Sequence, residues 1–593
     1  MTIKKLSVLL IFVTVFLMGL SSLVQGANFE DLSREVDDFI EERKEGTASV
    51  SLGIFKGGQV LSKTQHGYID EENNIPAEEK SIYEWGSVSK VLVWISLMQL
   101  EEEGKINLDE DVKTYLPQEF SKELKYPHPL TLKNIMNLQS GFQEVDIKVE
   151  FEEGEEIPEL QDLLLASEPK QIYEPGTVVA YNNWTPALGA YIVENISGQK
   201  FYDYVQEHIF TPLNMKNTAV AADWRDNAFV KDNRSKSKSY YYTEDSHESL
   251  GPCILHIGLY PAGATAGTFD DFLTFAKEFT VEHPKFFKEA QTFERMMGAS
   301  LLFADGQPRI HHGLLSMDDA VHLVGHSGNT QGFTSSLWFD PTDKIGYAVM
   351  TNEPGETAYN YGLAQFLFGS GDRREEGGED ISGLYTSQRT IDQGPLRFIK
   401  YLSGILPISA TEKQGIFKVP LAGMTISYQG GNRYRFDNGN GLAYQVVERK
   451  GGILENFTTD SQALGTFEGA MAYALIAGAL FLLLAMIIRL VRRIISKLRK
   501  RENKISPSFI SHVAGSVISF AFIYLWLLAS SYSKVKIAIV SLICIGATLV
   551  ICWNFLSQLL EKIHGKGKGL GAVTWQLFMV VFVIFFQLYK FWG

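Results

Sequence analysis

A serine and a lysine three positions apart are the residues of this sequence best suited to covalent chemistry. Ser87 and Lys90 lie in Ser87-Val88-Ser89-Lys90, which opens an apolar segment running to Leu100. A helix that begins at Ser87 places Lys90 one turn further along the same face, with its amine within reach of the hydroxyl. A serine hydroxyl is a weak nucleophile until a neighbouring base takes its proton, and a helix N-terminus favours the developing anion. The spacing therefore predicts an activated serine.

Two further segments carry polar residues in a suggestive order. Tyr181-Asn182-Asn183 precedes an apolar, helix-like run, and His326-Ser327-Gly328 lies between a β-like run and the turn-rich segment 329–332. Together with the serine motif, they resemble the three active-site elements of the serine β-lactamase and D,D-peptidase family. The branch with class C β-lactamases, D-alanyl-D-alanine carboxypeptidases and related esterases is the most similar. The resemblance covers about residues 29–368 and leaves the substrate open.

The resemblance implies a catalytic role for the first two motifs. Ser87 would attack a carbonyl carbon and form an acyl-enzyme. Lys90 and Tyr181 would handle the protons, with Tyr181 acting on the deacylating water, although coupled amine and phenol groups resist single assignment. Asn183 would hydrogen-bond both Lys90 and the substrate amide.

The third motif is expected to form the strand edge against which an extended substrate lies. His326, Ser327 and Gly328 would provide this edge, and the backbone N–H groups of Ser87 and Asn329 would form the oxyanion hole. Many relatives carry lysine at the position of His326, and an imidazole attracts a carboxylate more weakly than an ammonium does. This departure favours a peptidase or esterase over an efficient β-lactamase. An ordinary strand histidine is the alternative interpretation.

The β-like segments cluster at the two ends of the region that carries the motifs, and helix-like segments fill its middle. Two hairpins and the strand that carries His326 predict an α+β fold with an antiparallel five-stranded sheet and a helical insertion. We expect the active site in the cleft between sheet and helices. The predicted hairpin strands are 50–55 with 59–67, and 334–339 with 345–351.

Composition changes after this region. The charged, glycine-containing stretch 371–380 predicts a linker between a hydrolase domain at 29–370 and a small β-rich module at 381–465. Short alternating runs indicate the strands of the module. Its role is either a spacer or packing platform, or ligand binding.

The N-terminus predicts export. Lys4 and Lys5 precede an apolar stretch and small residues, which is typical of a signal peptide at 1–27; an uncleaved anchor is the alternative. The three cysteines, Cys253, Cys544 and Cys552, leave one thiol in the exported region. An exported chain without disulfides is more typical of bacteria than of an oxidising eukaryotic secretory route.

The C-terminal part, 469–593, predicts a four-helix membrane domain. Lys/Arg-rich loops follow the first and third runs, so the positive-inside rule places both loops in the cytoplasm and the catalytic domain outside. We therefore expect a multi-pass protein of the cell membrane. The four apolar runs, each about long enough for a bilayer core, are 469–490, 509–530, 535–559 and 570–588.

Charge and metal-ligand spacing restrict the partners. Residues 469–593 hold fourteen Lys/Arg and two Asp/Glu, a balance of +12, so the total of −15 leaves −27 on 1–468. Such an acidic domain repels polyanions, which argues against nucleic acid. His311-His312, Cys253 and His256 match no standard metal spacing, and the expected chemistry needs neither metal nor cofactor.

Two functions remain open at this point. The first is a membrane-anchored serine hydrolase that acts on cell-envelope D-alanyl peptides or esters. The second is a penicillin-recognising sensor, or an inactive binding protein, that signals through its membrane helices. Four spans exceed what anchoring requires, which keeps the second function open, whereas the few ionisable residues in them argue against transport.

Overall fold

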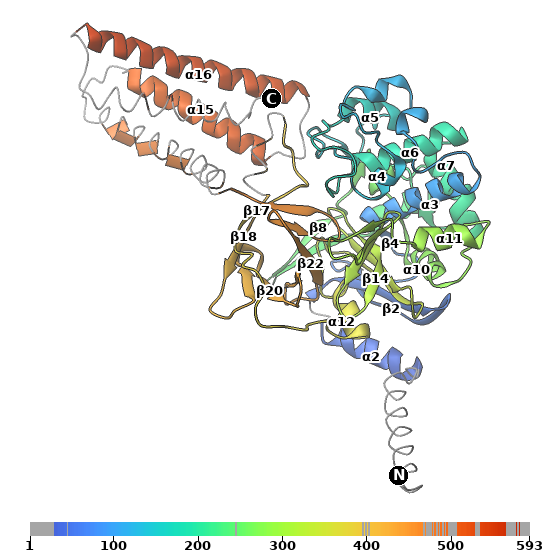
Figure 1. Cartoon of the computed structure of the whole chain (residues 1–593). Helices are drawn as coiled ribbons and strands as arrows, with labels where there is room; N and C mark the ends of the chain where they lie inside the picture. Colours follow the sequence, from blue (N-terminus) through green and yellow to red (C-terminus); the bar gives the residue numbers. More distant parts are fainter. Residues whose placement is uncertain are drawn as a thin grey trace, which may run out of the picture.

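The computed structural model describes residues 29–43, 46–243, 246–393 and 404–465, two C-terminal helices, and isolated residues elsewhere. Three parts are visible: an α+β region, a β-barrel beside it, and the two long helices (Figure 1). The predicted signal peptide lies outside the described residues.

A nine-stranded antiparallel sheet forms the base of the α+β region. The α+β class is confirmed, but the five-stranded sheet is wrong in its size. The five predicted strands are adjacent as β14, β15, β16, β1 and β2, and short strands extend both edges. Two- to five-residue strands leave too little alternation to be predicted from the sequence. In spatial order the strands are β11 (Leu301–Leu302), β12 (Pro308–His311), β13 (Leu314–Asp318), β14 (His322–Asn329), β15 (Thr334–Asp340), β16 (Ile345–Thr351), β1 (Ser49–Lys56), β2 (Gln59–Asp70) and β3 (Ile75–Pro76).

The helical part is built around α3 (Ser89–Glu102), whose residues 89–100 are all buried. A helix that is apolar on every side can only be stable inside a core. It packs against α6 (Trp184–Ser197). The other helices are α2 (Phe29–Glu41), α4 (Leu132–Met136), α5 (Leu160–Ser167), α7 (Phe201–Val205), α8 (Thr211–Leu213), α9 (Ala228–Asn233), α10 (Phe269–Lys277), α11 (Ala290–Met297) and α12 (Gly362–Phe368).

Three small sheets are separate from the large sheet. The first one joins β4 (Ile82–Glu84), β10 (Ala266–Thr268) and β6 (Thr218–Ala219), and its strand β4 directly precedes the serine motif. The others pair β5 (Glu150–Glu152) with β9 (Leu255–Ile257), and β7 (Ser239–Thr243) with β8 (Ser246–Gly251).

The β-rich module is a closed eight-stranded barrel, and closure removes the exposed strand edges that a sheet of this size would have. The stretch 371–380, predicted as a linker, contacts the barrel: Arg373 N donates to Gln429 Oε1 at 2.6 Å, and Glu375 N donates to Tyr428 O at 3.1 Å. The strands are β17 (Gly383–Ser387), β18 (Ile405–Ala410), β19 (Ile416–Val419), β20 (Met424–Tyr428), β21 (Arg433–Asp437), β22 (Ala443–Arg449), β23 (Ile453–Glu455) and β24 (Asp460–Ala463).

Buried ion pairs attach the barrel to the large sheet. Arg309 of β12 pairs with Asp460 of β24 at 2.7 Å, and both side chains are almost fully buried. Arg435 of β21 pairs with Asp319, just beyond β13, also at 2.7 Å. The barrel is therefore packed against the α+β region along one edge of the sheet.

The C-terminal helices α15 (Pro507–Leu527) and α16 (Lys534–Ile563) lie side by side (Figure 1). Among the described residues, one segment, Ile539–Ile563, is long and apolar enough to cross a membrane. The apolar stretch of α15, Phe509–Ala521, is shorter than the roughly 20 residues that a bilayer core requires. Most of the first and fourth predicted spans lies outside the described residues. The four-span domain is therefore not confirmed, and one candidate membrane helix is supported.

Candidate active site

Ser87 and Lys90 lie where the sequence placed them, at the start of a buried helix. Ser87 is in a short 3-10 turn, η2 (Gly86–Val88), that leads directly into α3. Lys90 Nζ lies 2.9 Å from Ser87 Oγ. The amine also donates to the backbone carbonyl of Ala262 at 2.6 Å. These two bonds fix the amine beside the hydroxyl.

Burial favours the neutral form of the Lys90 amine. The side chain has no solvent exposure, and this desolvation lowers its pKa well below the ordinary value. The positive charge of Arg389 lowers the pKa further, and Glu144 opposes it. A buried amine with a depressed pKa is populated in its neutral form at lower pH and can accept the Ser87 proton.

Tyr181 lies against the same amine. Lys90 Nζ is 4.9 Å from the centroid of the Tyr181 ring. Burial raises the pKa of the phenol, and the nearby Ser87 hydroxyl and Arg389 oppose this effect. Among the described residues, the Tyr181 hydroxyl oxygen is buried and makes no regular hydrogen bond. The structure thus brings the hydroxyl, amine and phenol together from two distant segments.

The third motif lies on β14, directly beside the serine turn. A Cβ added to Gly328 would lie 2.0 Å from Trp85 O and 2.8 Å from Ser87 N, so only glycine permits this approach. Gly86 has a φ of +50°, and a Cβ there would lie 2.7 Å from Asn329 N. The backbone N–H groups of Ser87 and Asn329 therefore belong to two segments in tight contact, as an oxyanion hole requires.

His326 and Ser327 have different environments on this strand. His326 is 3% exposed, and desolvation together with the charge of Lys90 lowers its pKa to about 3. Its Nδ1 bonds the carbonyl of Ser327 at 2.7 Å. The imidazole is therefore neutral and cannot provide a positive charge for a substrate carboxylate. Ser327 Oγ is half-buried and accepts a hydrogen bond from Tyr361 Oη at 2.6 Å.

A cavity of about 210 Å³ adjoins Ser87. Its walls include Ser87, Asn183, Glu150, Ala262 and Asn329. The structure places Asn183 in this wall rather than on the amine: its side chain forms no hydrogen bond to Lys90, whose second partner is instead Ala262. A carbonyl group that enters the cavity meets Ser87 and Asn329.

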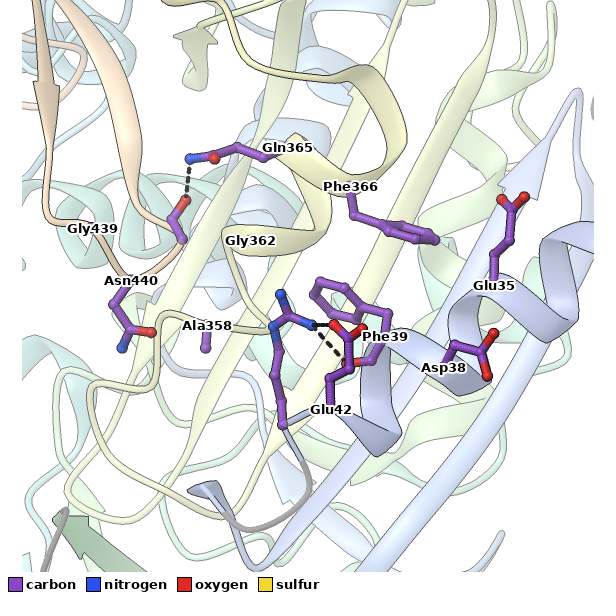
Figure 2. A pocket seen from close by; sticks show the side chains of 12 residues that line it. Glu35, Asp38, Phe39, Glu42, Ala358, Gly362, Gln365, Phe366, Gly439 and Asn440 are labelled. Atoms are coloured by element: carbon purple, nitrogen blue, oxygen red, sulfur yellow. Dashed lines mark hydrogen bonds and ion pairs between the residues drawn. The ribbon is translucent and has the colours of Figure 1, made fainter.

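A larger hollow, of about 560 Å³, lies between α2, α12 and the barrel loop 439–441 (Figure 2). Glu35, Asp38 and Glu42 give it an acidic lining. Gln365 Nε2 of α12 donates across it to Gly441 O at 3.1 Å. The residues that line this hollow include no pair of nucleophile and base, and the hollow marks the boundary between the barrel and the α+β region.

The sequence prediction assigned no role to three residues near Ser87, Lys90 and Tyr181. Ala262 contributes only its backbone carbonyl to the site, and no side-chain pattern reveals such a contact. Glu144 and Arg389 form an ion pair, with Nε and Oε1 2.6 Å apart, and Arg389 lies in the loop after β17 of the barrel. Their separation in the chain left no local signal.

The histidines considered as possible metal ligands bind backbone carbonyls in the structure. His256 Nδ1 bonds Ala222 O at 2.9 Å and His311 Nδ1 bonds Met297 O at 2.5 Å. Among the residues that the structure describes, no group of three or more His, Cys, Asp or Glu side chains is arranged to hold a metal ion.

Comparison with known proteins identifies one family. The family model described as Beta-lactamase matches residues 36–368. Protein flp of Staphylococcus aureus strain MW2 is 24% identical over 329 residues, which are 54% of this chain and 63% of that protein. The putative penicillin-binding protein PbpX of Bacillus subtilis strain 168 is 28% identical over 187 residues, 31% of this chain and 44% of that protein.

The similarity to these curated relatives covers less than two thirds of their length. Among solved structures, the octameric penicillin-binding protein homologue from Pyrococcus abyssi matches with a TM-score of 0.48 and 18% identity. That match covers 73% of this chain and 99% of the homologue.

Proposed function

Because this chain belongs to the beta-lactamase family, we propose that it is a serine hydrolase that works through an acyl-enzyme on Ser87. One observation carries the proposal: a fully buried amine with a depressed pKa lies 2.9 Å from the Ser87 hydroxyl oxygen. Desolvating an amine costs free energy, and this cost favours a functional reason for burying Lys90 beside a hydroxyl.

Acylation begins when neutral Lys90 accepts the proton of Ser87 Oγ. The oxygen forms a bond to the substrate carbonyl carbon, and the N–H groups of Ser87 and Asn329 stabilise the oxyanion. Tyr181 donates its phenolic proton to the leaving amine or alcohol and recovers one from the Lys90 ammonium. The carbon–leaving-group bond breaks, and the acyl group remains on Ser87.

Deacylation runs the same relay in reverse. A water molecule attacks the acyl carbon and its proton passes to Tyr181, which hands its own proton to Lys90. The Ser87 oxygen leaves and takes back a proton, so the enzyme is restored and the carboxylic acid is released. Lys90 and Tyr181 act as one coupled pair in both steps.

We further propose cell-envelope D-alanyl peptides or esters as substrates, with the catalytic region outside the cell. The neutral His326 supports this choice over a β-lactamase that binds carboxylates tightly. Exposed apolar side chains on α16 support membrane anchoring: Leu542, Leu549 and Trp553 are 68%, 65% and 72% exposed. The multi-pass arrangement with four membrane spans is part of this proposal.

Turnover of a chromogenic ester by the detergent-solubilised full chain tests the proposal. We expect Ser87→Ala to abolish turnover and Ser96→Ala to retain it. Ser96 is a fully buried serine of α3, whereas Ser87 is half-buried, and the Ser96 hydroxyl donates to Leu92 O at 2.7 Å. Mass spectrometry should find the acyl group on Ser87.

Two results would contradict the proposal. Equal turnover by wild type and Ser87→Ala would remove Ser87 from the reaction. Long-lived labelling of Ser87 by a fluorescent penicillin, without any ester turnover, would instead indicate the penicillin-recognising sensor.

A further inference from the structure

We propose that Arg389 of the barrel is a positioning residue of the Ser87 site, with its guanidinium held over the Tyr181 ring. This inference rests on the proposed function. It makes the barrel a functional part of the site and not merely a spacer, although the barrel lies wholly outside the region 36–368 that matches the family.

The guanidinium is fixed from two sides. Arg389 Cζ lies 5.0 Å from the centroid of the Tyr181 ring, within the range of a cation–π contact. Arg389 Nε donates to Glu144 Oε1 at 2.6 Å, and Glu144 N donates to the carbonyl of the next barrel residue, Thr390, at 3.0 Å. The ion pair and the backbone bond together hold the loop after β17 beside the phenol.

The barrel also holds the backbone of the Tyr181 segment. Ala180 and Thr459 form an isolated β-bridge, and Tyr181 N donates to Thr459 Oγ1 at 3.4 Å. On the same side, Val179 N donates to Asp460 Oδ2 at 3.1 Å. Barrel residues therefore determine both where the phenol sits and which charge faces its ring.

The charges around the phenol give this contact a consequence for catalysis. The Arg389 charge lowers the pKa of both Lys90 and Tyr181, whereas Glu144 raises both. A lower pKa of Lys90 populates its neutral form, and a lower pKa of Tyr181 eases the transient loss of its proton in the relay. The titratable or charged groups that face Tyr181 are Ser87, Lys90, Glu144, His326, Tyr361 and Arg389.

If Arg389 had a purely structural role, its removal would lower the stability of the fold and would affect catalysis only through that loss. However, its side chain is 44% exposed, and an exposed ion pair contributes little to folding. Its removal should therefore leave the unfolding temperature almost unchanged. A change in catalysis with no matching change in stability would separate the two roles.

The test compares the pH profile of kcat/KM for ester turnover in the full chain. Removing a unit charge at this range, with partial exposure to solvent, should move the acidic limb of Arg389→Gln upward by about half to one pH unit. On that limb kcat/KM should fall about 3- to 10-fold. Arg389→Lys retains the charge and should restore most of the profile.

Arg433→Gln is the matched control. Arg433 is another barrel arginine paired across the boundary, with its Nε 2.5 Å from Asp305 Oδ2, and it lies away from Ser87. A wild-type profile in Arg389→Gln would overturn the inference. An equal shift in Arg433→Gln, or no rescue by Arg389→Lys, would do the same. A wild type without turnover would overturn the proposed function, and this inference with it.

Discussion

Substitution of Gly86 by alanine tests the oxyanion hole. The new Cβ would lie 2.7 Å from Asn329 N and 3.0 Å from the carbonyl carbon and oxygen of the same residue. These atoms are backbone, so the contact is relieved only when β14 moves away from the serine turn. A displacement of about half an ångström already exceeds the tolerance of a catalytic arrangement.

Two separate costs follow from this substitution. Gly86 has a φ of +50°, where a residue with a side chain loses about 1–2 kcal/mol of stability. The overpacked contact adds about 1–3 kcal/mol. If Asn329 N moves out of reach of the oxyanion, kcat should fall about 100-fold, as for other lost oxyanion donors.

Gly104→Ala separates these effects. Gly104, just beyond the end of α3, also has a positive φ, +69°, but a Cβ there meets nothing within 4 Å. Both variants lose stability from the backbone, and only Gly86→Ala displaces Asn329. Ester turnover and thermal unfolding of the full chain should be measured side by side. A kcat for Gly86→Ala within about threefold of Gly104→Ala would refute the assigned oxyanion hole.

Three further predictions concern buried charged groups. Lys90→Met should lower kcat about 1000-fold without loss of stability, because it removes a base together with a buried amine; calorimetry of a clearly less stable variant would contradict this. Glu84→Gln should lose about 3–5 kcal/mol in urea unfolding because Glu84 pairs with Arg234 at 2.7 Å and both are buried. By contrast, Glu79→Gln, at an exposed pair with Lys63 at 3.5 Å, should lose less than about 1 kcal/mol. Burial, with Glu356 nearby, raises the pKa of Glu353 from 4.5 to about 8, so the folded state binds the proton more tightly than the unfolded state. The stability of the wild type should therefore fall as the pH rises from about 5 to 8. Over the same range, the stability of Glu353→Gln relative to the wild type should increase. A constant difference across this range would mean that Glu353 does not titrate there.

The sequence by itself determined the parts of the site that depend on local geometry. Ser87 and Lys90 are one helical turn apart, so their contact follows from spacing and from the apolar run that makes α3 a core helix. The five central strands were predicted from β-like runs and from the turn residues that separate them. The motifs at Tyr181 and His326 also carried a family resemblance, which the family match confirms.

The tertiary structure decided everything that depends on contacts between distant segments. The two- to five-residue strands at the sheet edges exist because neighbouring strands offer hydrogen-bonding partners, and no periodicity marks them. The second hydrogen-bond partner of Lys90 is a backbone carbonyl, Ala262 O, which the pattern of side chains cannot predict. Arg389 reaches Tyr181 only because the barrel docks beside it. Such contacts depend on how distant segments pack against one another, and the spacing of residues along the sequence does not specify that packing.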